Sequence, residues 1–227
     1  MALAETVGII IHAFNEEDRI GMTIYALKKI SCVEKILVID DGSSDSTAEV
    51  ARISGAEVLR LEKNLGKGKA LKKGLETIET TIVAFVDADI GETAIEIEKL
   101  ILPVLEGHAD VTIAKIPFVP GKGGFGIVKK FSRLALEKLT GIGLESVLSG
   151  QRCFRREIMN PQFLKYNRFG IEFGMTVDLI NSNLRIMEVP IQIQHRVTGK
   201  DLKGFIHRGK QFFDILTVFL SKSLLKY

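Results

Sequence analysis

Short apolar runs alternate with longer amphipathic stretches through the first half of the chain. Five runs rich in β-branched residues are bounded by polar residues or glycine, at 7–11, 35–39, 56–59, 82–86 and 111–114. Between them, apolar residues recur at helical spacing in 16–30, 44–53, 67–78 and 93–105. Buried strands that alternate with amphipathic helices indicate βαβ units and a parallel sheet. Ligands of such sheets bind at the carboxyl ends of the strands, so we expect the functional site there.

The pattern changes after residue 114. A glycine-rich loop at 121–126 follows Pro117 and Pro120 and precedes a helical stretch at 127–139. Beyond it, the segment 148–154 precedes a predicted helix near 173–181, a strand at 185–194 and an amphipathic helix within 202–225. Neither an internal repeat nor a low-complexity linker separates these segments. We therefore predict a single α/β domain over 1–227, with one half at 1–115 and the other at 116–227.

The composition is that of an ordinary globular protein. Of 227 residues, 46% are hydrophobic and 26% are charged, which excludes intrinsic disorder. The apolar runs are far shorter than the roughly 18 residues of a membrane span, and the first residues lack the positive charge of a signal peptide. Cys32 and Cys153 are too few for a disulfide scaffold, so we expect two ordinary core residues and a cytoplasmic protein.

Positive charge is concentrated at the C-terminus. Residues 195–227 carry a surplus of five positive charges, whereas the preceding 194 residues carry a net charge of −2. Such a segment suits an anionic partner, and it equally suits a solvated helix face. A nucleic-acid partner is not expected, because the surplus is small and no aromatic and basic recognition motif is present.

Polar side chains follow three of the predicted strands. His12-Ala13-Phe14-Asn15-Glu16-Glu17 follows the first strand, where a dinucleotide fold would need a glycine-rich turn. Asp40-Asp41-Gly42 follows the second strand, and Asp87-Ala88-Asp89 follows the fourth. Neighbouring carboxylates repel each other unless a cation compensates them, and their oxygens suit Mg²⁺ or Mn²⁺. The pattern predicts a metal-assisted site at this edge.

Other polar and glycine-rich segments allow two interpretations. Ser43, Ser44 and Asp45 suit either helix capping or ligand contact. The segment Asn64-Leu65-Gly66-Lys67-Gly68-Lys69-Ala70 lacks the earlier glycine and the Ser or Thr of a phosphate loop. Glycines 121, 123 and 126 match G-x-G-x-x-G literally, but prolines separate them from the preceding strand. A mobile loop beside a ligand suits these glycines better than a dinucleotide site.

The motifs at 14–17, 40–45, 64–68 and 87–89 resemble, in order and spacing, the nucleotide-sugar half of GT-A glycosyltransferases, particularly family 2. The resemblance implies a Rossmann-like three-layer sandwich with a mostly parallel sheet and a nucleotide-sugar-binding half at 1–115. It further implies roles for the strand-end residues. Uracil and ribose would contact Asp41 and the 13–17 segment, and the diphosphate metal would bind Asp89. Lys69 or its neighbours would approach the nucleotide, and further donor contacts would come from Ala13, Asn15, Glu17, Asp87 and Ala88.

The second half is similar to glucosyl-3-phosphoglycerate synthases, relatives of family 2. The similarity rests on the 148–151 segment with Gly150 and Gln151, on the 169–174 segment with Glu172, and on His195-Arg196. It implies UDP-glucose as donor, an anionic acceptor such as phosphoglycerate, a catalytic role for Asp89 and a metal shell completed by His195. Glu172 suits either a catalytic role, as a base or an acceptor-orienting group, or a carboxylate at a helix start that the helix dipole favours. The acceptor would be held by the loop with Lys122 and Gly123 and by cationic groups, among which we expect Arg155 and Arg196.

Other interpretations remain open at this point. The segments 149–157 and 188–190 are also similar to polyprenyl-phosphate sugar synthases. The apolar stripe within 202–225 suits a membrane surface, but such periodicity more often marks a core or a homodimer face. A nucleotide-sugar-binding protein without catalysis is the rival of another class. Intact Asp87, Asp89 and His195 favour the enzyme.

Overall fold

A computed structural model of the chain describes residues 5–117, 126–166, 168–194 and 202–224, with the backbone alone for 202–208. Within these residues, seven strands form one sheet in the order β3-β2-β1-β4-β6-β5-β7. The strands are β1 (Val7–Ala13), β2 (Val33–Asp40), β3 (Glu57–Arg60), β4 (Ile82–Asp87), β5 (Val111–Lys115), β6 (Arg152–Arg155) and β7 (Ile186–Pro190). Every neighbouring pair is parallel except the two that involve β6. The mostly parallel sheet is confirmed.

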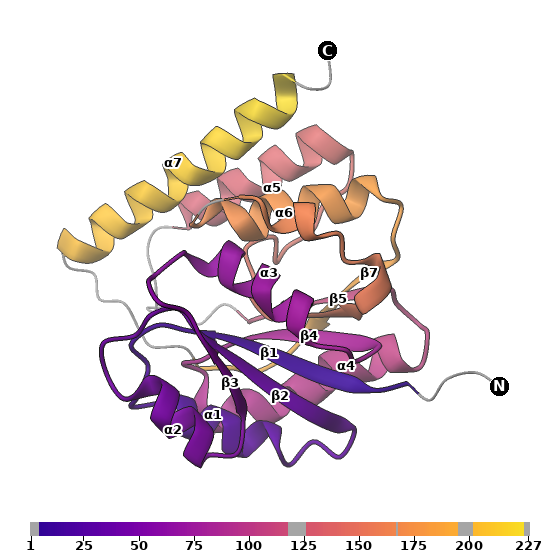
Figure 1. Cartoon of the computed structure of the whole chain (residues 1–227). Coiled ribbons are helices and arrows are strands. Elements are labelled where there is room, and N and C mark those ends of the chain that lie inside the picture. Colours follow the sequence, from indigo (N-terminus) through magenta and orange to yellow (C-terminus); the bar gives the residue numbers. More distant parts are fainter. Residues whose placement is uncertain (1–4, 118–125, 167, 195–201, 225–227) are drawn as a thin grey trace.

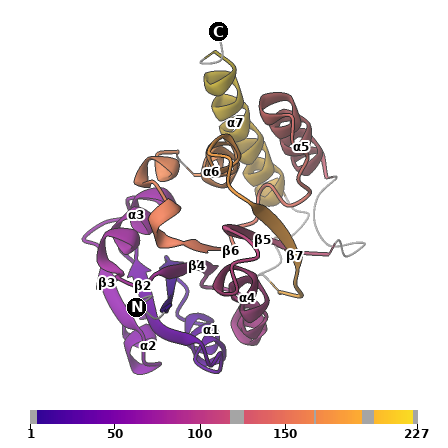
Figure 2. The same ribbon diagram turned by 90° about the vertical axis from the view of Figure 1, so that its right-hand side faces the viewer.

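Helices cover both faces of this sheet. The α-helices are α1 (Ile20–Leu27), α2 (Thr47–Ile53), α3 (Lys67–Thr77), α4 (Glu98–Leu105), α5 (Ile127–Thr140), α6 (Gly170–Asn181) and α7 (Leu202–Leu224), and 3-10 turns lie at η1 (Gly91–Ile97), η2 (Arg156–Ile158) and η3 (Pro161–Leu164). Helices α1, α2 and α4 lie on one side of the sheet and α3 and α6 on the other, with α5 and α7 stacked beyond α6 (Figures 1 and 2). The three-layer α/β sandwich is therefore confirmed.

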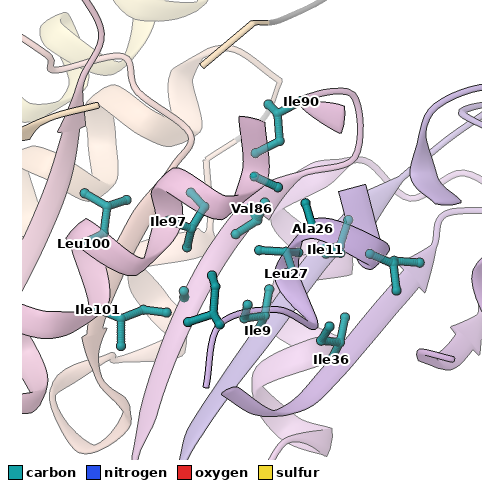
Figure 3. Close-up of a cluster of buried hydrophobic side chains, with 14 of the residues drawn as sticks. Ile9, Ile11, Ala26, Leu27, Ile36, Val86, Ile90, Ile97, Leu100 and Ile101 are labelled. Carbon is teal, nitrogen blue, oxygen red and sulfur yellow. The ribbon is translucent and has the colours of Figure 1, made fainter. Parts of the chain in front are cut away.

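Alternation along the strands builds two cores. Ile9 and Ile11 of β1 point toward α1 and α4, where they pack with Leu27 and Leu100 (Figure 3). The intervening Ile10 points to the other face, where it packs with residues of α3 such as Leu71. Side chains of a strand alternate between the two faces of a sheet, so a strand that is apolar at every position needs helices on both sides.

The cysteines belong to the first of these cores. Cys153 is fully buried and Cys32 is half-buried, and both thiols are free. Burial raises the pKa of both thiols, which keeps them protonated and unreactive. The expectation of ordinary core residues agrees with this placement.

The C-terminal helix α7 packs on α5 and α6. Ile215 and Val218 enter a third apolar core, and the Phe131 ring of α5 lies 4.7 Å from the ring of Phe212. The opposite side of α7 is open, since Phe213 is 66% exposed. In the described part of the chain, no helix combines the length and apolarity needed to cross a bilayer.

The order of the strands brings three strand ends to one crevice. The chain leaves β1 toward β2 on one side and reaches β4 on the other, and such a reversal opens a crevice at the carboxyl ends of the strands. His12 lies in register with Asp87 of β4, and Ala13 lies in register with Asp40 of β2. The carboxylates at the ends of β2 and β4 therefore share one edge, as the sequence predicts.

Candidate active site

The loops after β1 and β2 are joined by side-chain hydrogen bonds. The Asn15 amide donates to Ser43 Oγ at 3.0 Å, and Asn15 Oδ1 accepts from the Ser44 amide at 2.9 Å. Glu17 Oε2 accepts from the Ser46 amide at 2.8 Å. Asn15 adopts a left-handed backbone with φ 55°, so the chain turns here and α1 begins at Ile20 rather than at the predicted residue 16. Ala13 is buried at the end of β1.

Asp41 supports the neighbouring loop from a fully buried position. Its oxygens accept from the Leu65 amide at 2.7 Å and the Gly66 amide at 2.9 Å, and His12 Nε2 lies 3.3 Å from Oδ2. Burial by itself raises the pKa of this carboxyl, but the bonds from His12 and the two amides outweigh it and hold the pKa below its usual range. Asp41 thereby orients the loop before α3. The contact with the nucleotide that the sequence suggests for Asp41 stays a prediction.

Gly42 allows that loop to come close. Its φ is +75°, and a Cβ at this position would lie 2.7 Å from the carbonyl carbon of Lys63 and 2.8 Å from the Asn64 nitrogen. Both atoms belong to the backbone, so they cannot move aside as a flexible side chain would. Only glycine fits between the two strand-end loops.

Asp87 is held by Gln151, the residue that directly precedes the antiparallel strand β6. Gln151 Nε2 donates to Asp87 Oδ2 at 2.7 Å, and the Asp87 amide donates to Gln151 Oε1 at 3.0 Å. Gln151 is fully buried, whereas Asp87 is partly exposed at the edge. The neighbouring Ala88 is buried, and its carbonyl accepts from Thr23 Oγ1 at 2.7 Å.

Lys67, the first residue of α3, connects this carboxylate to Glu172. Its Nζ lies 2.8 Å from Asp87 Oδ1 and 2.9 Å from Glu172 Oε1. Burial by itself lowers the pKa of the ammonium, but the two adjacent carboxylates outweigh it and raise the pKa above its usual range. Glu172 lies in the first turn of α6. The ion pairs therefore join three elements: β4, α3 and α6.

Gly150 lies directly over the Lys67–Asp87 ion pair. A Cβ there would lie 2.8 Å from Lys67 Nζ and 2.8 Å from Asp87 Oδ2. Any larger residue would have to displace one of the paired charges. This places Gly150 and Gln151, both expected from the sequence, at the centre of the site.

Arg152 supports the segment that carries Gly150. The side chain is fully buried; its Nε donates to the Ser149 carbonyl and its Nη2 to the Val147 and Glu172 carbonyls, each at 3.0 Å. Burial lowers the pKa of this guanidinium to about 10, and nearby Glu172 opposes the shift. Arg152 therefore ties the 147–149 segment to the start of α6.

Asp89 follows β4 at the same edge and is partly exposed. Its carbonyl accepts from Arg19 Nη1 at 3.2 Å. Among the described residues, no group of three or more His, Cys, Asp or Glu side chains converges as a metal site. Carboxylate oxygens fit Mg²⁺ or Mn²⁺, which proteins commonly bind through one or two carboxylates completed by substrate phosphates. The donor set formed by Asp87 and Asp89 fits a cation that arrives together with a diphosphate.

A cavity of about 930 Å³ extends from Asp87 and Gly150 along α5. Lys129, Lys130 and Arg133 line its α5 side. Glu137 of the same helix also lines it, and Lys115 at its edge is paired with Glu145 at 2.7 Å. The cavity is large enough for a small ligand and presents a basic wall beside the carboxylates.

Two of the predicted site residues lie elsewhere. Because β6 runs antiparallel to β4, Arg155 pairs in register with Ile82 at the amino end of β4, away from the site. There it contacts Glu5 at 2.6 Å. The expectation that Arg155 binds substrate is not supported by this placement. Lys69 lies on the exposed side of α3, so Lys67, two residues earlier, is the lysine that reaches the carboxylates.

Four further predicted residues lie outside the described residues: Lys122, Gly123, His195 and Arg196. The roles that the sequence suggests for them in metal and acceptor binding stay predictions. Ser43 and Asp45, for which capping and ligand contact were both open, make bonds within the protein, since Asp45 Oδ1 accepts from the Thr47 amide at 3.0 Å.

The sequence holds an ambiguous signal for Lys67 and none for Arg152. Lys67 lies in the 64–70 segment, which partly matches a phosphate loop, and its position at a helix start is compatible with the site edge. Arg152 follows Gly150-Gln151 without any local feature that predicts burial.

Known proteins resemble the chain over most of its length. The model of the family "Glycosyl transferase family 2" matches residues 8–164. A glucosyl-3-phosphoglycerate synthase of Mycolicibacterium paratuberculosis is 29% identical over 197 residues, which cover 76% of this chain and 59% of that protein. A polyprenol monophosphomannose synthase of Mycolicibacterium smegmatis is 26% identical over 213 residues, which cover 84% of this chain and 78% of that protein.

A solved structure agrees in fold. The glucosyl-3-phosphoglycerate synthase of Mycobacterium tuberculosis, in complex with Mn²⁺, UDP and glucosyl-3-phosphoglycerate, superposes with a TM-score of 0.81 at 25% identity. The match covers 96% of this chain and 80% of that one.

Proposed function

The chain belongs to glycosyltransferase family 2. From this premise we propose that it transfers a sugar from a nucleoside diphosphate sugar to an anionic acceptor. The first candidate for the donor is UDP-glucose, and the transfer would use Mg²⁺ or Mn²⁺. The observation that carries the proposal is the continuity between the strand-end carboxylates and the basic cavity along α5. A donor site and an acceptor site that meet at Asp87 and Gly150 are what a transfer reaction requires. We further propose that residues 1–227 act as one domain.

The donor is assigned to the crevice at the ends of β1, β2 and β4. The 13–17 segment with Asn15 and Glu17 and the loop held by Asp41 would contact the nucleoside. Lys67 begins α3, and the N-terminus of a helix favours a diphosphate. Asp89, with Asp87 beside it, would hold the metal, which stabilises the negative charge that develops on the leaving diphosphate.

Glu172 is the residue that we assign to the acceptor hydroxyl. Lys67 holds the Glu172 carboxylate in place through the 2.9 Å contact, and a carboxylate oxygen can accept a proton from a hydroxyl group or orient it. Arg152 binds the Glu172 carbonyl and thereby holds the first turn of α6 in place. Gly150 leaves room above the carboxylates for reacting groups.

The basic wall of the cavity supports an anionic acceptor. Lys129, Lys130 and Arg133 line one side of it, and several cations gathered in a cavity attract phosphate or carboxylate groups. A phosphorylated small molecule such as phosphoglycerate is the first candidate, because a synthase of this acceptor is a relative and a structural neighbour.

A polyprenyl phosphate is the second candidate. The observation that favours it is the exposure of Phe213 and Leu220, at 66% and 51%, on the open side of α7. A relative that is named a polyprenol monophosphomannose synthase agrees with this chemistry. Exposed apolar groups flanked by lysines suit the surface of an anionic membrane.

One assay separates these possibilities. The purified protein is incubated with UDP-glucose and Mn²⁺, and with phosphoglycerate, a polyprenyl phosphate in detergent, or a neutral sugar as acceptor. We expect UDP release to depend on metal and on an anionic acceptor. Donor binding without UDP release for any acceptor would favour the binding protein without catalysis. Equal transfer to neutral and anionic acceptors would contradict the assignment of the basic cavity.

A further inference from the structure

Lys67 occupies the position between two carboxylates that come from different layers of the fold. Its Nζ contacts Asp87 of β4 at 2.8 Å and Glu172 of α6 at 2.9 Å. The three side chains are only 13–26% exposed. Two carboxylates this close to each other in a half-buried site need a counter-charge, and here an ammonium of the protein supplies it.

We propose that Lys67 is a resident counter-cation of the donor-free site, and that its presence makes binding of the divalent metal depend on the donor's diphosphate. The inference rests on the proposed function for the identity of the donor. It concerns the order in which the divalent metal and the donor's diphosphate bind, which the transfer reaction by itself does not determine.

Both carboxylate oxygens of Asp87 already accept hydrogen bonds within the protein. One carboxylate oxygen accepts from Lys67 and the other accepts from Gln151 at 2.7 Å. A dication that approaches this carboxylate competes with both donors and meets the positive charge of Lys67. Repulsion between an ammonium and a nearby dication weakens metal binding to the donor-free protein.

Lys67 lies where its side chain could contact a bound diphosphate. It is the first residue of α3, whose N-terminus lies at the edge where the diphosphate is assigned. A lysine side chain is a flexible stem with a compact charge, and it can exchange a carboxylate partner for a phosphate partner without movement of the backbone. The diphosphate adds negative charge that compensates Lys67 and supplies oxygen ligands to the metal. Donor and metal then bind cooperatively.

The close approach of Gly150 indicates that the Lys67–Asp87 ion pair is a packed part of the site rather than a loose surface contact. A Cβ at this position would lie 2.8 Å from both Lys67 Nζ and Asp87 Oδ2. The backbone at Gly150, in the 147–150 segment, therefore packs against the ion pair. Arg152 holds that segment by donating to the carbonyls of Ser149 and Val147.

The test measures Mn²⁺ binding directly, by electron paramagnetic resonance of free Mn²⁺, with and without UDP. For the wild-type protein we expect UDP to tighten Mn²⁺ binding at least tenfold. For Lys67→Met we expect donor-free Mn²⁺ affinity to rise at least tenfold, so that the effect of UDP shrinks. Lys72→Met removes the same charge from an exposed position of the same helix and should behave as the wild type.

Two results would overturn the inference. One is wild-type Mn²⁺ affinity that is equal with and without UDP, a comparison that needs no variant and is unaffected if Lys67→Met folds poorly. The other is a folded Lys67→Met protein, verified by its melting curve, whose donor-free Mn²⁺ affinity stays within twofold of wild type. Failure of the proposed function is a separate result: a protein that shows this metal coupling but transfers sugar to no acceptor would contradict the transferase assignment alone.

Discussion

Gln151 and Asp87 are joined by two hydrogen bonds. The Gln151 side-chain nitrogen donates to the Asp87 carboxylate at 2.7 Å, and the Asp87 backbone amide donates to the Gln151 side-chain oxygen at 3.0 Å. The pair exists because β6 runs antiparallel beside β4 and brings residue 151 next to residue 87. A fully buried amide thus sets the direction of a carboxylate at the edge of the active site. A single substitution can remove this orientation of the carboxylate, and a reaction that needs aligned groups then becomes slower.

Gln151→Glu should lower the transfer rate about 10- to 100-fold, equivalent to about 1.4–2.7 kcal/mol of barrier. The change removes the amide donor and places a second carboxylate against Asp87. Steady-state kinetics with UDP-glucose and the preferred acceptor measure the effect. Gln162→Glu is the matched control, since Gln162 is exposed in η3. Equal rates for the two variants would remove Gln151 from the list of positioning residues.

Asp89→Ala should leave the protein folded while nearly abolishing transfer. The carboxylate is assigned to the metal, whose loss affects the developing charge on the diphosphate more than it affects the fold. Transfer assays at several Mn²⁺ concentrations, together with circular dichroism, test this. Glu34→Ala removes an exposed carboxylate near the amino end of β2 and should retain activity. Full activity of the wild type in excess chelator would contradict the metal assignment.

The double variant Lys129→Gln and Lys130→Gln should raise the KM for an anionic acceptor several-fold and leave the KM for the donor unchanged. Both lysines line the cavity beside the carboxylates, and their effect should weaken as added salt screens the charges. The comparison variant is Lys138→Gln, on the exposed surface of α5 but not in the cavity lining. A similar KM for all three proteins would place the acceptor elsewhere.

Asp41 should make stability depend on pH in the acid range. Its pKa is lower in the folded protein than in the unfolded chain, where a carboxyl of this type titrates at about 3.9. The stabilisation is therefore fully present above the unfolded pKa and is lost as the pH falls through the lowered folded pKa. Asp41→Asn should be destabilised by about 1–3 kcal/mol at pH 7, because one backbone amide loses its acceptor.

Urea unfolding of both proteins between pH 7 and pH 3 measures this dependence. The difference between wild type and Asp41→Asn should narrow at the acid end. Asp18→Asn, an exposed substitution in the preceding loop, controls for the change in net charge. A constant difference across the whole pH range would contradict the assigned role of the carboxylate.

Lys222→Met should loosen the C-terminal helix. Lys222 of α7 pairs with Asp178 of α6, both about 15% exposed, and Asp178 also accepts from Tyr166 Oη at 2.6 Å. Loss of the ammonium leaves the carboxylate partly uncompensated, and we expect a loss of about 2 kcal/mol in unfolding free energy. Thermal unfolding measures it against Lys210→Met, an exposed lysine of the same helix. Equal melting temperatures would show that apolar packing alone seats α7.

Local patterns in the sequence determined the architecture and the edge that carries the site. Apolar runs at 7–11 and 82–86 could be identified as strands because burial on both faces requires every position to be apolar, a property that can be read residue by residue. The polar residues that follow them then had to meet at one edge, since parallel strands end on the same side. The positions of Asp41, Asp87 and Asp89 followed from this rule alone.

Only the tertiary structure decided which neighbouring residues act. The direction of β6 depends on pairing with β4 and β5, which are distant in sequence; because β6 is antiparallel, Gln151 reaches the site while Arg155 lies at the far edge. Lys67 and Lys69 are two positions apart and so point about 200° apart on a helix, and the packing of α3 selects Lys67. Arg152 is buried because backbone carbonyls from two separate segments converge on it. Such long-range contacts leave no periodic signal in the chain, and they set the charges on which the chemistry depends.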